Sequence, residues 1–363
     1  MLKEVTIRRR AALMGGVFAL GMGFAGIAAA QDVNFEGETI EIMVNFAAGG
    51  GTDTAARLVA PFIARHLPGT PSVIVTNRAG AGGTAAVDYL IDSLPPDGLH
   101  IGYFSGTPIR WALGLQQVPQ GTGDLPYVAA RSVNQIFQVR TDIGLTPETF
   151  QNYDDPLFFA INSADNHVAI RARFLAEAMG VTDFNLITGY AGQGNMVAAV
   201  RAGETEMAQT NDSFFGANRD AITGDGVLEP FGQMGEYVGG QIVAQEGLED
   251  IPVFDQMWRD YSPETLDTPQ YQAWEAIHIA MSIQNVFVLP PNTPEEMMPV
   301  WEGAILDAYS DPDYLAQLET AGVPAPASVG SAEIAERMAR LRSIFDDDAI
   351  ISAVSEAIAR NSE

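Results

Sequence analysis

The stretch Ile40-Glu-Ile-Met-Val-Asn-Phe46-Ala-Ala-Gly49-Gly50-Gly51-Thr52-Asp53 joins two structural patterns. Apolar residues alternate with others up to Phe46, which predicts a half-buried β-strand. The glycines connect this strand to a predicted helix, which Thr52 or Asp53 can cap. Glycine lets backbone N–H groups approach a ligand closely, and a helix N-terminus favours negative charge. This strand-to-helix turn therefore predicts a site for an anion such as a carboxylate.

A second turn of the same kind lies at Val73-Ile-Val-Thr-Asn77-Arg78-Ala79-Gly80-Ala81-Gly82-Gly83. It separates a strand from a helix over residues 83–94, which the turn Pro95-Pro96-Asp97-Gly98 ends. A third strand over residues 99–104 leads into Ser105-Gly106-Thr107. Strands and helices that alternate through short loops predict a doubly wound, mostly parallel sheet. In such sheets ligands bind beyond the carboxyl ends of the strands, where both glycine turns lie.

A second unit with the same alternation follows. Its predicted strands cover residues 157–161, 184–187 and 207–210, and its predicted helices cover 168–179 and 195–202. Two such units predict an α/β protein of two lobes, with the ligand in the cleft between them. We assign residues 32–133 and 243–363 to the first lobe and residues 134–242 to the second.

The C-terminal third is predicted to be mainly helical. Thr293-Pro294-Glu295-Glu296 has the pattern of a capping box with proline at the first helical position, and another helix is expected after Ser331. Residues 245–276 are acidic and aromatic without a clear period, which predicts an excursion on the surface. We expect Trp258 and Trp274 to lie in the core or cover it, and not to form a platform for a ligand.

The first thirty residues have the pattern of an export signal. Lys3 and Arg8-Arg9-Arg10 precede an apolar run that reaches Ile27, and Ala28-Ala29-Ala30 follows. This order predicts a signal peptide over residues 1–30, with a membrane anchor as the alternative. The run is short of the ~20 strongly apolar residues that a membrane span needs. The arginines also permit twin-arginine export, although we favour the Sec route.

The composition excludes several functions. A net charge of −27 argues against nucleic acid as a partner, because binding phosphates needs clustered Lys and Arg. The chain has no Cys and no Lys after Lys3, which excludes cysteine catalysis, a pyridoxal Schiff base and a Walker lysine. Its four histidines are far apart in the sequence and none forms an H-E-x-x-H motif. We therefore expect no metal, no cofactor and no catalysis.

One motif formally suggests a dinucleotide. Residues 80–85 fit the pattern G-x-G-x-x-A, which is weak evidence when it stands alone. The acidic residue that should end the next strand is missing, because that strand ends in Tyr103-Phe104-Ser105. A plain turn, or a turn that binds a carboxylate, is the better interpretation.

In order and spacing, these motifs resemble those of the substrate-binding proteins of tripartite tricarboxylate transporters, also called the Bug family. The resemblance rests on Phe46 to Arg57, on Asn77 to Gly83 and on Pro96-Asp97-Gly98, and it continues weakly to about residue 345. It implies a periplasmic two-lobed "Venus flytrap" that binds a small organic acid or an amino-acid-like ligand. It also implies delivery of that ligand to membrane permease subunits.

The resemblance further implies a ligand site built from glycines and polar residues at the strand ends. Carried over to this sequence, these are Gly50, Gly51, Thr52, Asp53, Gly80, Ala81, Gly82, Gly83, Ser105, Thr107, Asn162, Asp165, Asn166, Tyr190, Gly192 and Gln193. Two departures from the family pattern stand out: Ala79 replaces the usual proline, and Asp165-Asn166-His167 replaces a loop of Gly, Ser and Thr. A ligand with an amine or amide group therefore stays open beside a carboxylate.

Two other functions remain as alternatives. The same fold could serve as a sensor subunit that presents its closed form to a signalling receptor. Less favoured is a periplasmic hydrolase with paired carboxylates, in which Asp53 would act together with Asp165 or Asp212. Loss of turnover in an Asp53→Asn variant would distinguish the hydrolase from a binding protein.

Overall fold

The computed structural model describes residues 33–49, 51–113, 118–151, 153–164, 167–190 and 192–362. The predicted signal peptide therefore lies outside the described residues, as do Gly50, Asp165 and Asn166 of the predicted site. Within the described ranges, no helix has both the length and the apolar character needed to cross a bilayer.

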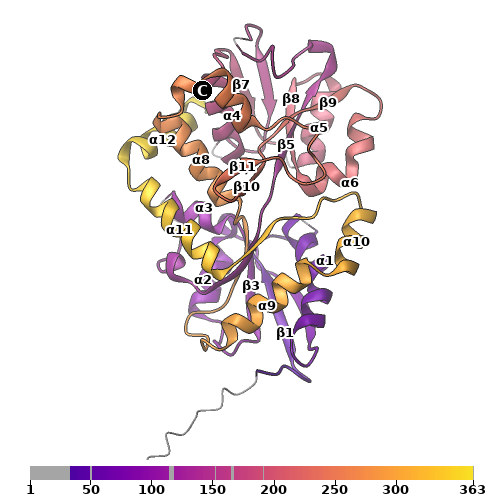
Figure 1. The fold of residues 1–363 in the computed structure, drawn as a ribbon, viewed down its shortest axis with the longest axis vertical. Helices are drawn as coiled ribbons and strands as arrows, with labels where there is room; N and C mark the ends of the chain where they lie inside the picture. Colours follow the sequence, from indigo (N-terminus) through magenta and orange to yellow (C-terminus); the bar gives the residue numbers. More distant parts are fainter. Residues whose placement is uncertain are drawn as a thin grey trace, which may run out of the picture. The chain divides into compact units, whose positions relative to one another are not determined.

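The first sheet combines parallel and antiparallel strands (Figure 1). In order across the sheet, its six strands are β13 (Ser328–Gly330), β4 (Tyr127–Arg131), β12 (Asn285–Val288), β3 (His100–Ser105), β1 (Thr39–Val44) and β2 (Ser72–Asn77). Strand β1 pairs in parallel with both β2 and β3, whereas β12 runs antiparallel to both of its neighbours. The carboxyl ends of β1, β2 and β3 therefore meet at one edge, as the sequence predicts.

The second sheet has five strands of the same mixed kind. In order they are β7 (Phe184–Ile187), β6 (Leu157–Ala160), β8 (Met207–Asn211), β5 (Gln135–Arg140) and β9 (Leu228–Gln233). Strands β7, β6 and β8 are parallel, and β5 is antiparallel to both β8 and β9. The hairpin of β10 (Glu236–Val238) and β11 (Gln241–Val243) follows β9. The predicted two-lobed α/β fold is confirmed, with sheets that are mixed in their pairing.

Helices pack on both sheets. The helices that contact strands of the first sheet are α1 (Gly51–His66), α2 (Thr84–Asp92), α9 (Met297–Tyr309) and α11 (Ser331–Phe345). Those that contact strands of the second sheet are α4 (His167–Ala178), α5 (Gln193–Ala202) and α6 (Asp212–Thr223). The remaining helices are α3 (Thr107–Ala112), α7 (Phe254–Tyr261), α8 (Pro269–Met281), α10 (Pro312–Thr320) and α12 (Asp348–Arg360). The described residues also form four short 3₁₀ turns: η1 (Ala81–Gly83), η2 (Thr122–Asp124), η3 (Thr141–Ile143) and η4 (Pro263–Thr265).

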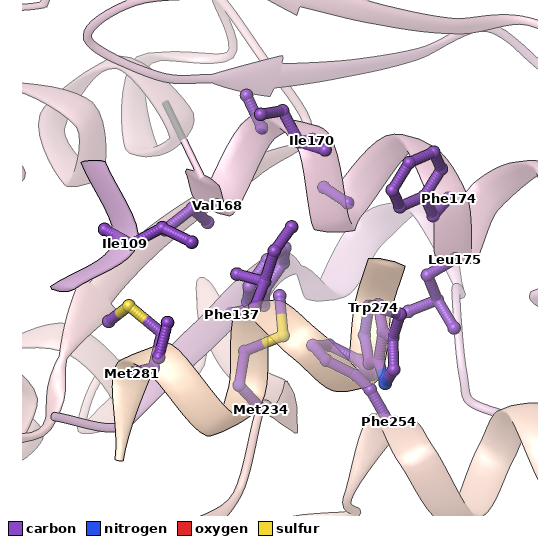
Figure 2. Close-up of a cluster of buried hydrophobic side chains, with 14 of the residues drawn as sticks. Ile109, Phe137, Val168, Ile170, Phe174, Leu175, Met234, Phe254, Trp274 and Met281 are labelled. Atoms are coloured by element: carbon purple, nitrogen blue, oxygen red, sulfur yellow. The ribbon is translucent and has the colours of Figure 1, made fainter. Parts of the chain in front are cut away.

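Two buried clusters hold these layers together. One lies between the first sheet and helices α1 and α9, and includes Ile42, Tyr103 and Trp301. The other covers the opposite face of that sheet and continues through α4, α7 and α8 to the second sheet. Figure 2 shows part of this second cluster, with Ile109 of α3 and Trp274 of α8 among its labelled side chains. Its apolar surface, removed from water, is the main stabilising contribution in this region.

Two predictions for the C-terminal third are wrong. Residues 245–276 do not form a surface excursion, because Trp258 of α7 and Trp274 of α8 are fully buried. Helix α8 is buried on most sides and therefore lacks the amphipathic period that marks a surface helix. The capping box is also wrong: α9 begins at Met297, and the hydroxyl of Thr293 donates to the carbonyl oxygen of Pro290 instead.

The chain passes between the sheets at residues 132–134, which link β4 to β5. It returns to the first sheet at β12 by way of α7 and α8, and both of these helices pack against α4 of the second unit. Helix α12 also packs against α4 and α8. The division into lobes at residues 134 and 242 stays a prediction.

Candidate functional site

Asp53 fixes the first glycine turn to its surroundings. Its buried carboxylate accepts hydrogen bonds from the backbone N–H of Gly49 at 2.8 Å, from Asn77 Nδ2 at 2.9 Å and from Arg57 Nε at 3.0 Å. The bond from Arg57 is the largest cause that lowers the pKa of Asp53 to about 2, and those from Gly49 and Asn77 add to it against the effect of burial. Asp53 thus ties the turn to the end of β2. Its direct contact with a ligand stays a prediction.

The second glycine turn has a backbone that only small residues tolerate. All four residues from 80 to 83 have positive φ angles, and Gly83 has a φ of 100°. A Cβ atom on Gly83 would lie 2.6 Å from Nδ2 of Asn45, which is too close for any side chain. Asn45 in turn donates to the carbonyl oxygen of Ser105 and accepts from its N–H, both at 3.0 Å. The ends of β1 and β3 and the second turn are therefore held in one arrangement.

A small cavity opens at this edge of the first sheet. Asn45, Gly83, Thr107 and Arg110 are among the residues that line it. Its volume of about 10 Å³ has room for roughly one water molecule. The predicted site residues Gly83 and Thr107 therefore meet at one point, beside an arginine that the sequence did not single out.

The second sheet presents a matching set of turns. The amide oxygen of Gln193, at the start of α5, accepts a hydrogen bond at 3.2 Å from the backbone N–H of Asn211. Asn211 caps α6 by accepting from the N–H of Phe214 at 2.8 Å. The hydroxyl of Tyr190 lies 3.4 Å from a carboxylate oxygen of Glu204, within its own lobe. Whether Tyr190 contacts a ligand stays a prediction.

The two sets of turns lie close together. A Cβ atom on Gly51, at the start of α1, would be 3.8 Å from Nδ2 of Asn211. Asn211 therefore lies next to both Gly51 of the first turn and Gln193 of α5. The carbonyl oxygen of Asn162 accepts a hydrogen bond from the backbone N–H of Gly189 at 3.1 Å. In the described part of the chain, no three His, Asp or Glu side chains lie together as metal ligands would.

The network around Asp53 gives a test of its stabilising role. Because its folded pKa of about 2 lies below the ordinary value of 3.8, its contribution is complete above pH 4 and is lost as the pH falls towards 2. We expect Asp53→Asn to lower the free energy of unfolding at pH 7 by ~1–2 kcal/mol, after allowing for solvent screening at the half-exposed Arg57. Urea unfolding at pH 7, 4 and 2.5 measures this, and the difference from wild type should shrink at the lowest pH. A difference that stays constant across these pH values would contradict this role.

The fold defines a class: a two-lobed α/β fold of the periplasmic-binding-protein type. No family model matches the chain, and no curated protein matches it. Solved structures do match, and they confirm at the level of the fold the resemblance drawn from the motifs.

Two of these structures are of binding proteins, and a third contains bound malate. A TctC solute-binding protein from Polaromonas, solved without ligand, is 20% identical, covers 88% of this chain and 98% of its own, and has a TM-score of 0.62. The periplasmic binding protein BugD is 17% identical over 88% of this chain and 97% of its own, with a TM-score of 0.57. MatC from Rhodopseudomonas palustris, with bound malate, is 18% identical over 85% of this chain and 98% of its own, with a TM-score of 0.54. This chain therefore has the fold of the TctC and Bug solute-binding proteins.

Proposed function

We propose that this chain is a periplasmic solute-binding protein that captures a small organic acid between its two lobes. It would then deliver the acid to the permease subunits of a tripartite tricarboxylate-type transporter. The observation that carries the proposal is the approach of Gly51 to Asn211, which brings the first glycine turn next to the helix starts of the second sheet. The site residues that the motifs predict are part of the proposal.

The chemistry of these turns suits a carboxylate. Helices α1 and α5 begin at these strand ends, and a helix start has backbone N–H groups without partners inside the helix and a partial positive charge. Such a start is a ready site for an anion, and two around one cleft can bind a carboxylate without a metal. The malate in the MatC structure is an acid of this class.

Location and partners follow from the same proposal. The apolar run at residues 11–27 would direct export, and the solved proteins of this fold include periplasmic binding proteins. Closure of the lobes around the acid would create the form that the permease recognises. Uptake of the acid by a deletion strain distinguishes transport from a sensory role, because loss of a sensor leaves uptake intact.

A thermal-shift screen of the purified chain tests this function. The panel contains mono-, di- and tricarboxylates, amino acids and neutral amides. A ligand at ~100 times its dissociation constant should add about 2.7 kcal/mol, which raises the melting temperature of a chain of this size by about 4 °C. A rise with one class of carboxylate supports the proposal. A rise only with amines or amides contradicts it, as does a flat screen together with no acid found by mass spectrometry of the denatured protein.

A further inference from the structure

A second cavity, much larger than the one at the strand ends, lies on the flank of the first sheet. Helix α11 and the segment from α3 to the start of β4 line it, and α3 and α11 pack against each other (Figure 1). Its volume is about 480 Å³, whereas the cavity beside Asn45 has about 10 Å³. Ligand sites in proteins commonly measure ~300–1,000 Å³, so this cavity, which we call the flank pocket, has room for a small organic molecule.

The flank pocket is separate from the predicted organic-acid site. Tyr127, at the start of β4, is part of its lining, and β12 places Tyr127 level with Gly102 of β3 through Val288. Ser105 of the predicted site lies further along β3, by ~10 Å at the usual rise of a strand. Strand β12 also lies between β4 and β3 in the sheet. The flank pocket and the glycine turns can therefore hold different molecules.

Trp111 of α3 forms one wall of the flank pocket and is held from two directions. The guanidinium carbon of Arg342, on α11, lies 4.9 Å from the centroid of its ring. A Cβ atom on Gly123 would lie 2.5 Å from Nε1 of Trp111, so the backbone there packs directly on the edge of the indole. Met298 and Met338 belong to the same lining, and methionine sulfur makes favourable contacts with aromatic rings. The pocket therefore suits a planar apolar group.

Two exposed side chains of opposite charge, Arg342 and Asp124, also line the flank pocket. Among the described residues neither of them forms an ion pair, although most of the other arginines do. A guanidinium can bind a carboxylate through two parallel hydrogen bonds, and a carboxylate can accept from an ammonium group. One charge of each sign beside an apolar chamber complements a zwitterion with an apolar body.

We propose that the flank pocket is a second ligand site, which takes an α-amino acid with a large apolar side chain, preferably an aromatic one. Trp111 and the two methionines contact that side chain, while Arg342 binds the carboxylate and Asp124 binds the ammonium group. This site goes beyond the function proposed above and does not depend on it, because the organic acid would bind at the strand ends.

Trp111 gives the site a direct optical readout. The chain has four tryptophans, and Trp258, Trp274 and Trp301 are at most 1% exposed, so acrylamide quenches mainly Trp111 in the folded protein. The probes are L-phenylalanine, phenylpropionate, which lacks the ammonium group, and phenethylamine, which lacks the carboxylate. We expect L-phenylalanine to protect Trp111 from quenching in a saturable way. Isothermal titration should show that the other two bind more weakly by ~10-fold or more, since each lacks one charge-assisted hydrogen bond.

Variants test whether binding takes place in the flank pocket. Arg342→Gln and Asp124→Asn should each weaken binding of L-phenylalanine by ~10-fold. The matched controls Arg219→Gln and Asp250→Asn remove the same charges from a surface pair outside the pocket and should bind like wild type. Ala335→Phe fills the pocket and should abolish binding. Because Ala335 is exposed on α11, this variant should melt near the wild-type temperature.

The outcomes decide whether the flank pocket binds an amino acid. Saturable protection of Trp111 that Ala335→Phe abolishes supports the proposal, and Ala339→Phe, at a second exposed position of the lining, should have the same effect. Unchanged binding to both filled variants would mean that L-phenylalanine binds elsewhere, and no protection by any probe would mean that the pocket has no such ligand. Equal binding of phenylpropionate or phenethylamine would show that one of the two charges is not recognised. Each of these three results overturns the proposal.

Competition separates this site from the proposed function. The organic acid with the largest thermal shift should leave the affinity for L-phenylalanine unchanged, and its displacement of L-phenylalanine would show one shared site and overturn the proposal. If no organic acid binds, the proposed function fails, while protection of Trp111 by L-phenylalanine still supports the flank pocket.

Discussion

Replacing Asp212 with alanine is expected to lower the free energy of unfolding by about 3–5 kcal/mol, because it leaves Arg131 as a lone buried charge. Arg131 and Asp212 are 5% and 1% exposed, and Nη2 of Arg131 lies 3.4 Å from a carboxylate oxygen of Asp212. Although burial opposes it, the carboxylate raises the pKa of Arg131 above its ordinary value. Asp212 also accepts from Nε2 of Gln245 at 3.4 Å and from the N–H of Ser213 at 2.6 Å.

Guanidinium-chloride unfolding measures this effect. The double variant Arg131→Met/Asp212→Leu removes both charges and should recover most of the stability that Asp212→Ala loses. Asp250→Ala, which removes a carboxylate from a surface pair with Arg219, is the matched control and should change the free energy by less than ~1 kcal/mol. A double variant as unstable as Asp212→Ala would show that the hydrogen bonds of Asp212 matter more than its charge.

The surroundings of this pair explain why it is polar. Residues 132–134 carry the chain from one sheet to the other, and Asn134 is fully buried there. Its Nδ2 donates to Gln233 at 2.8 Å, and Nε2 of Gln233 donates to the carbonyl oxygens of Leu248 and Ile251. Directional bonds of this kind fix how two passing segments cross, which apolar packing alone does not. The pair thus lies beside the segment that links the two sheets.

The strands that flank the glycine turns could be predicted from local sequence. Residues 40–46 alternate in polarity, and β1 occupies residues 39–44; residues 184–187 were predicted as a strand and form β7. Alternation and glycine-rich turns are local properties, so they can be recognised in the sequence without knowledge of the fold. Helix α8 has no such local pattern in its sequence, because most of its residues are buried and tertiary contacts decide its environment.

In the candidate site, too, some residues could be predicted from local sequence and others could not. Glycines at positions 80–83 follow from the motif, because a backbone with positive φ angles needs them. Arg110 carries no local signal, because a sequence does not show which groups a charged side chain lies beside. Arg110 lines the small cavity at the end of β1, so only the structure identifies it.

A side chain at Gly216 is expected to oppose closure of the lobes. In α6 of the second unit, a Cβ atom on Gly216 would lie 2.0 Å from the carbonyl oxygen of Gly322. Gly322 follows α10, a helix that packs on α1 and α9 of the first unit. In Figure 1, α6 and α10 appear on the side opposite α11 and α12. The contact between Gly216 and Gly322 therefore joins the two units at a place away from helices α8, α11 and α12, which pack against one another.

A side chain at Gly216 must push these two backbones apart. Overpacking of this kind costs about 1–3 kcal/mol, and we expect Gly216→Val to weaken binding of the organic acid with the largest thermal shift by ~10–100-fold. Stability without ligand should change little, since opening of the lobes relieves the clash. Gly303→Val is the matched control, because Gly303 also lies in a helix and a Cβ atom there meets no other atom within 4 Å. Titration calorimetry measures the affinity, and small-angle scattering should show that wild type contracts on adding the acid whereas Gly216→Val does not. Equal affinity and equal contraction would show that the acid binds without closing this contact.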